Sequence, residues 1–325
     1  MHRREFIGLL GGAAVAWPRA VRAQQGAVPL IGFLRSTSLT NAAHLVTAFH
    51  QGLKEIGYID GHNVAVEFHS AEGRPDRLAA LVADLIRRPV ALIVANTIAA
   101  VAAKAATNTV PIVFATGSDP VRDGLVASLN RPGGNLTGAV FFASVLGGKR
   151  LEQLRQLVPN ATTIALLVNP NTTETEAERS DVQAAALAMG QQLLTADVSS
   201  DRDIETAFAT LIQGGAGALL VGSGTFTFSH RGPIIALAAR HRLPASFTNR
   251  EAVLGGALLS YAASQTDAYR QVGIYAGRVL KGEKPADLPV TRITKFELVL
   301  NLKTAKTLGL EIPPTLLAVA DEVIE

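Results

Sequence analysis

Residues 91–120 of the chain read ALIVANTIAAVAAKAATNTVPIVFATGSDP. Two short apolar runs, 91–95 and 111–115, stand on either side of an alanine-rich stretch, 99–106, that has the composition of a helix. Strands that are apolar throughout are typical of a parallel sheet with both faces covered, and parallel neighbours need a helical crossover between them. The stretch therefore predicts a strand–helix–strand unit of an α/β fold.

The same alternation continues on both sides of this unit. Upstream, strands are expected at 29–34 and 63–68, and helices at 42–56 and 76–88. Downstream, a second series of elements is expected: strands at 163–168, 193–198, 218–221 and 243–247, and helices at 176–189, 201–212 and 233–241. Two such series predict two doubly wound parallel-sheet lobes.

The last part of the chain, 257–325, is too short to form a third lobe. It contains a helical pattern at 266–280 and a strand-like run at 296–300, so we expect it to return and complete the first two lobes. This assigns the chain as follows: a first lobe of residues 28–140 plus about 258–295, and a second lobe of 141–257 plus about 296–325.

The N-terminus has the order of an export signal. Arg3 and Arg4 precede a mostly apolar run, 6–17, and small residues allow cleavage before Gln24. This order predicts a signal peptide over 1–23, of the twin-arginine type, and a periplasmic location. The alternative is an amphipathic helix of the domain, which the lack of helically spaced polar residues disfavours.

Composition excludes several classes of protein. The chain has no cysteine, which excludes disulfides, thiolate metal sites, a cysteine nucleophile and a lipid anchor on cysteine. The net charge of +3 equals that of the first 23 residues, with four arginines and one glutamate, so the rest is near neutral and no nucleic-acid partner is expected. Stable membrane insertion of the mature chain is not expected either. Neither a metal-ligand motif nor a nucleophile or cofactor motif occurs, so we expect no catalytic residue, metal or cofactor.

Small polar residues follow the predicted strands in both series. In an open α/β sheet the carboxyl ends of the strands line the ligand crevice, and helix N-termini there can hold an anion. The alternative role of each such residue is helix capping; for Asp119, followed by Pro120, the choice lies between capping and binding an amine. The candidate ligand-binding residues of this type are Ser36, Thr97, Thr116, Gly117, Ser118, Asp119, Asn249 and Glu251.

Aromatic residues make up only 5% of the chain. Phe141 and Phe226 lie near strand ends or crossing segments, where they could stack on a flat or apolar ligand. The alternative is ordinary core packing. Both are included among the candidate ligand-binding residues.

Several motifs together resemble one family. They are the RREFIGLLGG start, FHQGLKEIGY at 49–58, PIVF at 111–114 with Asp119-Pro120, LNRPGGNLTG at 129–138 and KFELVLNLKTA at 295–305. This combination resembles the ABC transporter substrate-binding protein family, and within it the branch labelled tryptophan/tyrosine transport. The resemblance implies a type I periplasmic binding protein with a three-segment hinge and closure on ligand. It also implies that an amino acid is held by residues matching Thr97, Thr116 to Asp119, and Thr225 with Phe226.

The function expected on these grounds is that of a periplasmic receptor. It would bind an amino acid or a similar carboxylate, with an aromatic ligand suggested by the branch label, and deliver it to a membrane permease and its ATPase subunit. Hinge strands are expected near 139–142, 256–261 and 297–300, and the protein is expected to be a monomer. The alternatives are an exported α/β enzyme and a ligand-sensing module that use the same crevice.

Overall fold

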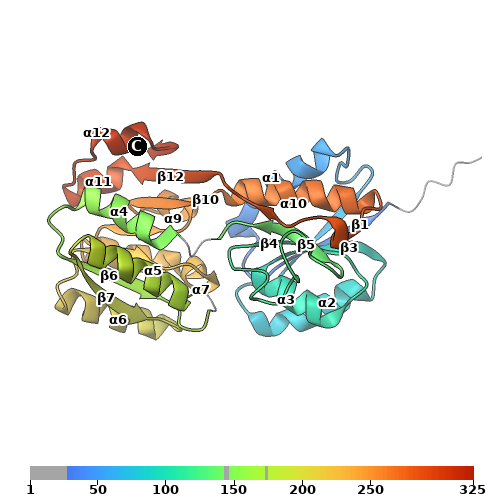
Figure 1. Ribbon diagram of the computed structural model, residues 1–325, viewed down its shortest axis with the longest axis horizontal. Coiled ribbons are helices and arrows are strands. Elements are labelled where there is room, and N and C mark those ends of the chain that lie inside the picture. The colour runs from blue at the N-terminus through green and yellow to red at the C-terminus, as the bar shows by residue number, and fades with distance from the viewer. Residues whose placement is uncertain (1–27, 143–145, 173–174) are drawn as a thin grey trace, which may run out of the picture.

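The computed structural model describes residues 28–142, 146–172 and 175–325. The expected signal peptide therefore lies outside the described residues. The chain forms two α/β lobes that lie side by side and are joined by extended segments (Figure 1). This confirms the predicted fold class of two doubly wound, mainly parallel sheets.

The first lobe is built on a six-stranded sheet in the order β11-β5-β4-β3-β1-β2, in which every pairing is parallel. Alternate side chains of each strand point to opposite faces: Phe33 packs into the core beneath α1 and α10, and Leu34 into the core beneath α2 and α3. The strands are β1 (Leu30–Arg35), β2 (Ala65–Ser70), β3 (Val90–Asn96), β4 (Ile112–Thr116), β5 (Leu136–Val140) and β11 (Thr291–Arg292). The α-helices are α1 (Ala43–Glu55), α2 (Leu78–Ile86), α3 (Thr97–Ala106) and α10 (Gln265–Leu280).

Helix α10 comes from the C-terminal part of the chain and packs along α1 (Figure 1). Two glycines allow this close approach. A Cβ at Gly52 would lie 1.9 Å from the backbone oxygen of Arg270, and one at Gly273 would lie 2.2 Å from that of Phe49. Their missing side chains let the two backbones touch, which fixes α10 to the first lobe.

The second lobe is built on a seven-stranded sheet in the order β13-β12-β10-β9-β8-β6-β7. Its pairings are parallel except for β10 with β12. The strands are β6 (Thr163–Val168), β7 (Gln192–Asp197), β8 (Ala218–Val221), β9 (Ala245–Phe247), β10 (Leu259–Ala263), β12 (Phe296–Asn301) and β13 (Glu322–Ile324). The helices are α4 (Gly147–Leu157), α5 (Thr175–Ala188), α6 (Asp201–Gln213), α7 (Thr225–Ser229), α8 (Arg231–Arg240), α9 (Arg250–Leu254), α11 (Leu302–Leu308) and α12 (Pro314–Ala318).

Both lobes share one strand order. Numbered within each lobe, the first five strands run 2-1-3-4-5, as β2-β1-β3-β4-β5 and as β7-β6-β8-β9-β10. In the first sheet β2 pairs with one side of β1 and β3 with the other side. In the second sheet β7 and β8 pair with the two sides of β6 in the same way. Such switch points are where open α/β sheets place their ligands, at the carboxyl ends of the strands.

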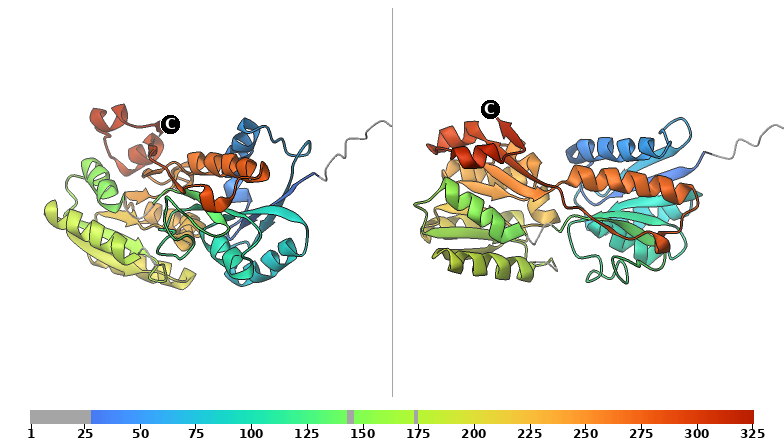
Figure 2. Two further views of the ribbon diagram at one scale, coloured as in Figure 1. Left: turned by 45° about the vertical axis from the view of Figure 1, so that its right-hand side comes forward. Right: turned by 45° about the horizontal axis from the view of Figure 1, so that its top comes forward.

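The crossings between the lobes differ in place from those expected. Strand β10 pairs with β9 and β12 of the second sheet, so the chain returns to the first lobe after Ala263 and not at about residue 258. The expected hinge segments 256–261 and 297–300 likewise lie largely within second-sheet strands. The described connections between the lobes lie between β10 and α10 and between β11 and β12 (Figure 2). The reason is that an antiparallel β10–β12 pair extends the second sheet beyond its parallel core.

Within the described ranges, the search for a helix both long and apolar enough to cross a membrane finds none.

Candidate functional site

The carboxyl-end edges of the two sheets meet at an ion pair. His44 lies in the first turn of α1, which follows β1, and Glu251 lies in the first turn of α9, which follows β9. The Nε2 of His44 lies 2.7 Å from the Oε1 of Glu251. The strand-end residues of the first lobe and those of the second lobe therefore face the same interlobe region.

Electrostatics favour the ionised form of Glu251. Burial by itself would raise the pKa of this carboxyl. The hydrogen bond and the charge of His44, with a smaller contribution from the charge of Arg231, outweigh burial and lower the pKa below its ordinary value. Glu251 is one of the candidate ligand-binding residues; in this structure its side chain contacts His44.

Three of the expected residues form a chain of hydroxyl groups in the first lobe. The Oγ1 atoms of Thr97 and Thr116 lie 2.9 Å apart, and Thr116 Oγ1 lies 2.7 Å from Ser118 Oγ. Ser118 Oγ donates in turn to a carboxylate oxygen of Asp123. Thr116 and Ser118 are buried and Thr97 is half-buried, with Gly117 in the turn between the first two.

Ser36 is joined to the end of the neighbouring strand. Its N–H donates to Asn96 Oδ1 at 2.8 Å, and Asn96 Nδ2 donates to Ser36 Oγ at 2.8 Å. This pair bridges β1 and β3 at the switch point of the first sheet, directly beside Thr97.

Asp119 and Asn249 each accept a hydrogen bond from a backbone N–H in this structure. Asp119 Oδ1 accepts from the N–H of Val121 at 2.9 Å. Asn249 Oδ1 accepts from the N–H of Ala252 at 3.0 Å, at the N-cap of α9. The contact of Asn249 matches the helix-capping alternative. Asp119 instead satisfies a backbone donor of a turn, because the described residues between β4 and β5 form no helix.

The two expected aromatic residues have neighbours in their own lobes. Phe226 is half-buried and stacks on His230 with ring centroids 4.0 Å apart. Phe141 packs against the core of the first lobe under α1 and α10.

A buried ion pair in the second lobe holds the loop after β8. Arg150 Nη2 donates to Glu178 Oε1 at 2.5 Å, and Arg150 Nη1 donates to the carbonyl oxygen of Val221 at 2.6 Å. Glu178 Oε2 accepts from both the N–H and the Oγ of Ser223, at 2.9 and 2.8 Å. The sequence does not mark this pair or His44, because no local pattern identifies side chains that meet only in the folded chain.

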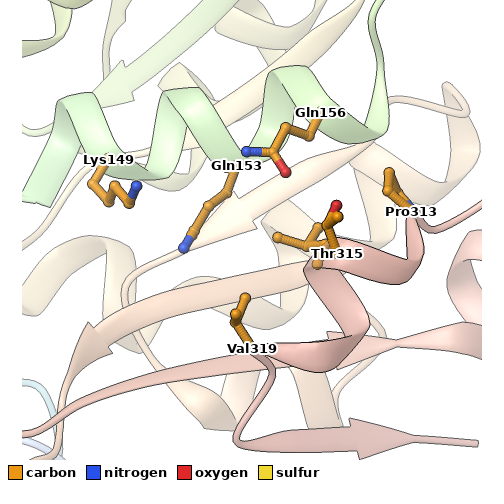
Figure 3. Close-up of a pocket in the computed structure, with 7 residues that line it drawn as sticks. Lys149, Gln153, Gln156, Pro313, Thr315 and Val319 are labelled. Atoms are coloured by element: carbon orange, nitrogen blue, oxygen red, sulfur yellow. The ribbon is translucent and has the colours of Figure 1, made fainter.

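Two cavities lie within the second lobe, away from the interlobe region. The larger, of about 600 Å³, lies between α4 and the C-terminal helix α12 (Figure 3). Gln153 is buried on its wall, and the Oε1 of this residue has no hydrogen-bond partner among the described residues. The smaller, of about 200 Å³, is lined by residues of α8, β9 and α11. None of the expected strand-end polar residues lines either cavity.

Metal ligands do not gather anywhere in the part of the chain that the structure describes: it has no group of three or more His, Asp or Glu side chains that could hold an ion.

Two lobes of order 2-1-3-4-5, facing each other across strand ends and linked by extended segments, define a type I periplasmic binding protein-like architecture. The model of one protein family, described as ABC transporter substrate binding protein, matches residues 31–324 of this chain. The chain belongs to this family, which confirms the resemblance found in the sequence.

Individual relatives agree with this assignment. The chain is 26% identical over 264 residues to a tyrosine-binding protein of Clostridioides difficile strain R20291, covering 81% of this chain and 76% of that protein. A Streptococcus pneumonia ABC domain in complex with L-Trp superposes with a TM-score of 0.83 at 28% identity. A ligand-free, open substrate-binding protein with adhesive properties from Clostridium difficile superposes with a TM-score of 0.69 at 25% identity. Each structural match covers 91% of this chain and 99% of the other.

Membership of the family sets the general activity. Its members bind small molecules for ABC transporters and work with the membrane components of those transporters. The family is one of solute-binding proteins and not of enzymes.

Proposed function

We propose that this protein is the receptor of an ABC importer and binds an aromatic amino acid between its two lobes, without catalysing a reaction. The observation that carries the proposal is the meeting of both strand-end edges at His44 and Glu251. This contact supports a binding site between the polar strand-end residues of the first lobe and Phe226 of the second lobe. The tyrosine-binding protein and the L-Trp complex among its relatives supply the chemical class of the ligand.

The lobe arrangement supports binding by closure. At similar sequence identity, the chain superposes better on the L-Trp complex than on the ligand-free open structure, with TM-scores of 0.83 and 0.69. The relative placement of the two lobes in this structure is therefore closer to that of a ligand-bound protein. It includes the ion pair between His44 and Glu251. A ligand that bridges both lobes would favour this state over the open one.

The proposed contacts divide between the lobes. The polar head of the amino acid lies at the strand ends of the first lobe, near Thr97, whose hydroxyl ends the chain of hydroxyl groups that it forms with Thr116 and Ser118. The side chain of the ligand lies toward the second lobe, where Phe226 offers a half-buried aromatic face. Glu251 contributes through its pair with His44, which holds the lobes together around the ligand.

We also propose that residues 1–23 direct export by the twin-arginine route, and that the mature chain works as a monomer in the periplasm. The Arg3/Arg4 pair and the apolar run that follows support this. Replacing both arginines with lysine should abolish periplasmic accumulation of the protein. Normal accumulation of that variant would contradict the route.

The function is tested by identifying the ligand directly. Protein purified from its host is denatured, the released small molecules are identified by mass spectrometry, and the refolded protein is titrated calorimetrically with L-tryptophan, L-tyrosine, L-leucine and L-glutamate. We expect saturable one-to-one binding of an aromatic amino acid, and weaker or no binding of the other two. Absence of binding by both aromatic amino acids, or conversion of either into a product, would contradict the proposal.

A further inference from the structure

Among the described residues, the buried positive charges outnumber the buried negative charges. In the described part of the chain three charged side chains are buried: Arg35, Arg150 and Glu178. Arg150 and Glu178 form an ion pair with each other. Arg35, which is only 5% exposed, forms no ion pair with any described carboxylate, although burying an isolated charge is strongly unfavourable.

The contacts of Arg35 are neutral and incomplete. Its Nη1 donates to the phenol oxygen of Tyr269 at 2.5 Å, and its Nη2 donates to Thr37 Oγ1 at 2.9 Å. Its Nε is buried without a hydrogen-bond partner among the described residues. A guanidinium offers five N–H donors in a planar fork that suits a carboxylate, so this one retains donor capacity and an uncompensated charge.

Tyr269 does not supply the missing negative charge. Burial raises the pKa of this phenol, and the nearby charge of Arg35 lowers it by less than burial raises it. The phenol therefore stays neutral, and its contact with Arg35 is a hydrogen bond supported by the ring, whose centroid lies 5.6 Å from the guanidinium carbon.

Arg35 stands at the place where a ligand is expected. It is the last residue of β1, next to Ser36, which is bonded to Asn96 at the end of β3. This is the switch point of the first sheet. The next α-helix, α1, begins at Ala43 and carries His44, which contacts the second lobe.

The neighbouring hydroxyl chain is less suited to a carboxylate. Ser118 Oγ gives its single proton to Asp123, and Thr116 Oγ1 is fully buried. The chain therefore offers an incoming ligand only its Thr97 end, one neutral hydroxyl. Arg35 offers a full positive charge.

We propose that Arg35 binds the carboxylate of the ligand and makes the protein selective for anionic ligands. This deepens the proposed function and rests on it for the aromatic class of the ligand. The carboxylate takes the place of the missing buried counter-ion, and the hydroxyl of Thr97 remains for the ammonium group. Arg35 is then a specificity-determining residue that joins the ligand to α10, through Tyr269, next to the crossing between the lobes.

The test compares acid and amide forms of the same ligand. L-tryptophan and L-tyrosine, and their carboxamides, are titrated calorimetrically in carboxylate-free buffer into the wild type, Arg35→Gln, Arg35→Lys and the control Arg278→Gln. Arg278 is a suitable control because it lies on α10, as Tyr269 does, and forms an ion pair with Glu283 within the first lobe. We expect the wild type and Arg278→Gln to prefer the acid by about 10- to 100-fold, the scale of a charge-assisted hydrogen bond.

Arg35→Gln should reduce that preference to about threefold or less, whereas Arg35→Lys, which keeps the charge, should retain a clear preference for the acid. Equal binding of acid and amide by the wild type, or an unchanged preference in Arg35→Gln, would overturn the role of Arg35 and leave the proposed function standing.

Mass spectrometry of ligands released from the wild type and Arg35→Gln separates the two proposals. An anionic ligand of another class that is present in the wild type and lost from the variant would overturn the aromatic assignment and uphold Arg35. Release of an uncharged ligand from both proteins, with no affinity for amino acids, would overturn both.

Discussion

The Nε2 of His44 and the Oε1 of Glu251 lie 2.7 Å apart and join the first lobe to the second. Both residues belong to helix first turns at the carboxyl-end edges of their sheets. The contact forms only when the lobes approach each other, so its energy contributes to the closed arrangement and not to the folding of either lobe alone.

Removing this contact should shift the protein toward an open arrangement. A partly exposed ion pair contributes about 0.2–1 kcal/mol, so Glu251→Gln should weaken ligand affinity by up to about fivefold with little change in the melting temperature. The control is Glu283→Gln, which removes an ion pair with Arg278 inside the first lobe. Calorimetry should show no loss of affinity in the control, and an equal loss in both variants would contradict the interlobe role.

The same pair predicts a pH dependence. The pKa of Glu251 is lowered in the closed state, so, while His44 carries its proton, the stabilisation that this carboxylate gives is present above the ordinary pKa of a glutamate and fades as the pH falls through the lowered value. Ligand affinity should therefore decline on acidification, in that range, more in the wild type than in Glu251→Gln. Parallel pH profiles for the two proteins would contradict this account.

The contact between α1 and α10 should tolerate no side chain at its glycines. Gly52→Ala would place a methyl group 1.9 Å from a backbone oxygen of α10, which forces the helices apart at a cost of about 1–3 kcal/mol. Lys54→Ala is the control, because Lys54 is an exposed residue of the same helix α1, and it should change stability by no more than about 0.5 kcal/mol. Thermal melts should show a clear loss of stability for Gly52→Ala and little change for the control; equal shifts would argue against the close packing.

Glu178 should stabilise the second lobe chiefly by neutralising Arg150. Glu178→Gln leaves the buried guanidinium without its counter-ion, and such a loss typically costs about 3–5 kcal/mol. The double variant Arg150→Met with Glu178→Leu removes both charges and should recover much of that loss. Urea denaturation followed by circular dichroism measures both, and a double variant less stable than the single one would contradict the charge argument.

Much of the fold could be predicted because the parallel strands are continuously apolar. The strands at 163–168 and 218–221 have the predicted bounds. Helix α4 was not predicted, because its buried face includes Arg150 and Gln153, which break the apolar pattern expected of a helix packed on a core. The place of β10 was also missed, because strand direction and partner depend on the whole sheet and not on the local sequence.

The candidate site could be predicted only in part. Thr97, Thr116 and Ser118 follow strands, and the structure joins them by hydrogen bonds. Arg35 and Tyr269 are 234 residues apart in the sequence, and His44 meets Glu251 only across the lobes. Such pairs leave no periodicity or spacing in the sequence, so they become visible only when the fold brings them together.

The central claim is that the ligand binds between the lobes, and a crystal structure of the protein with L-tryptophan or L-tyrosine tests it most directly. We predict density for the amino acid between the lobes, with its carboxylate on Arg35, its ammonium near Thr97 and its ring toward Phe226. Density confined to the cavity beside Gln153 in the second lobe, with the interlobe region free of ligand, would contradict the account.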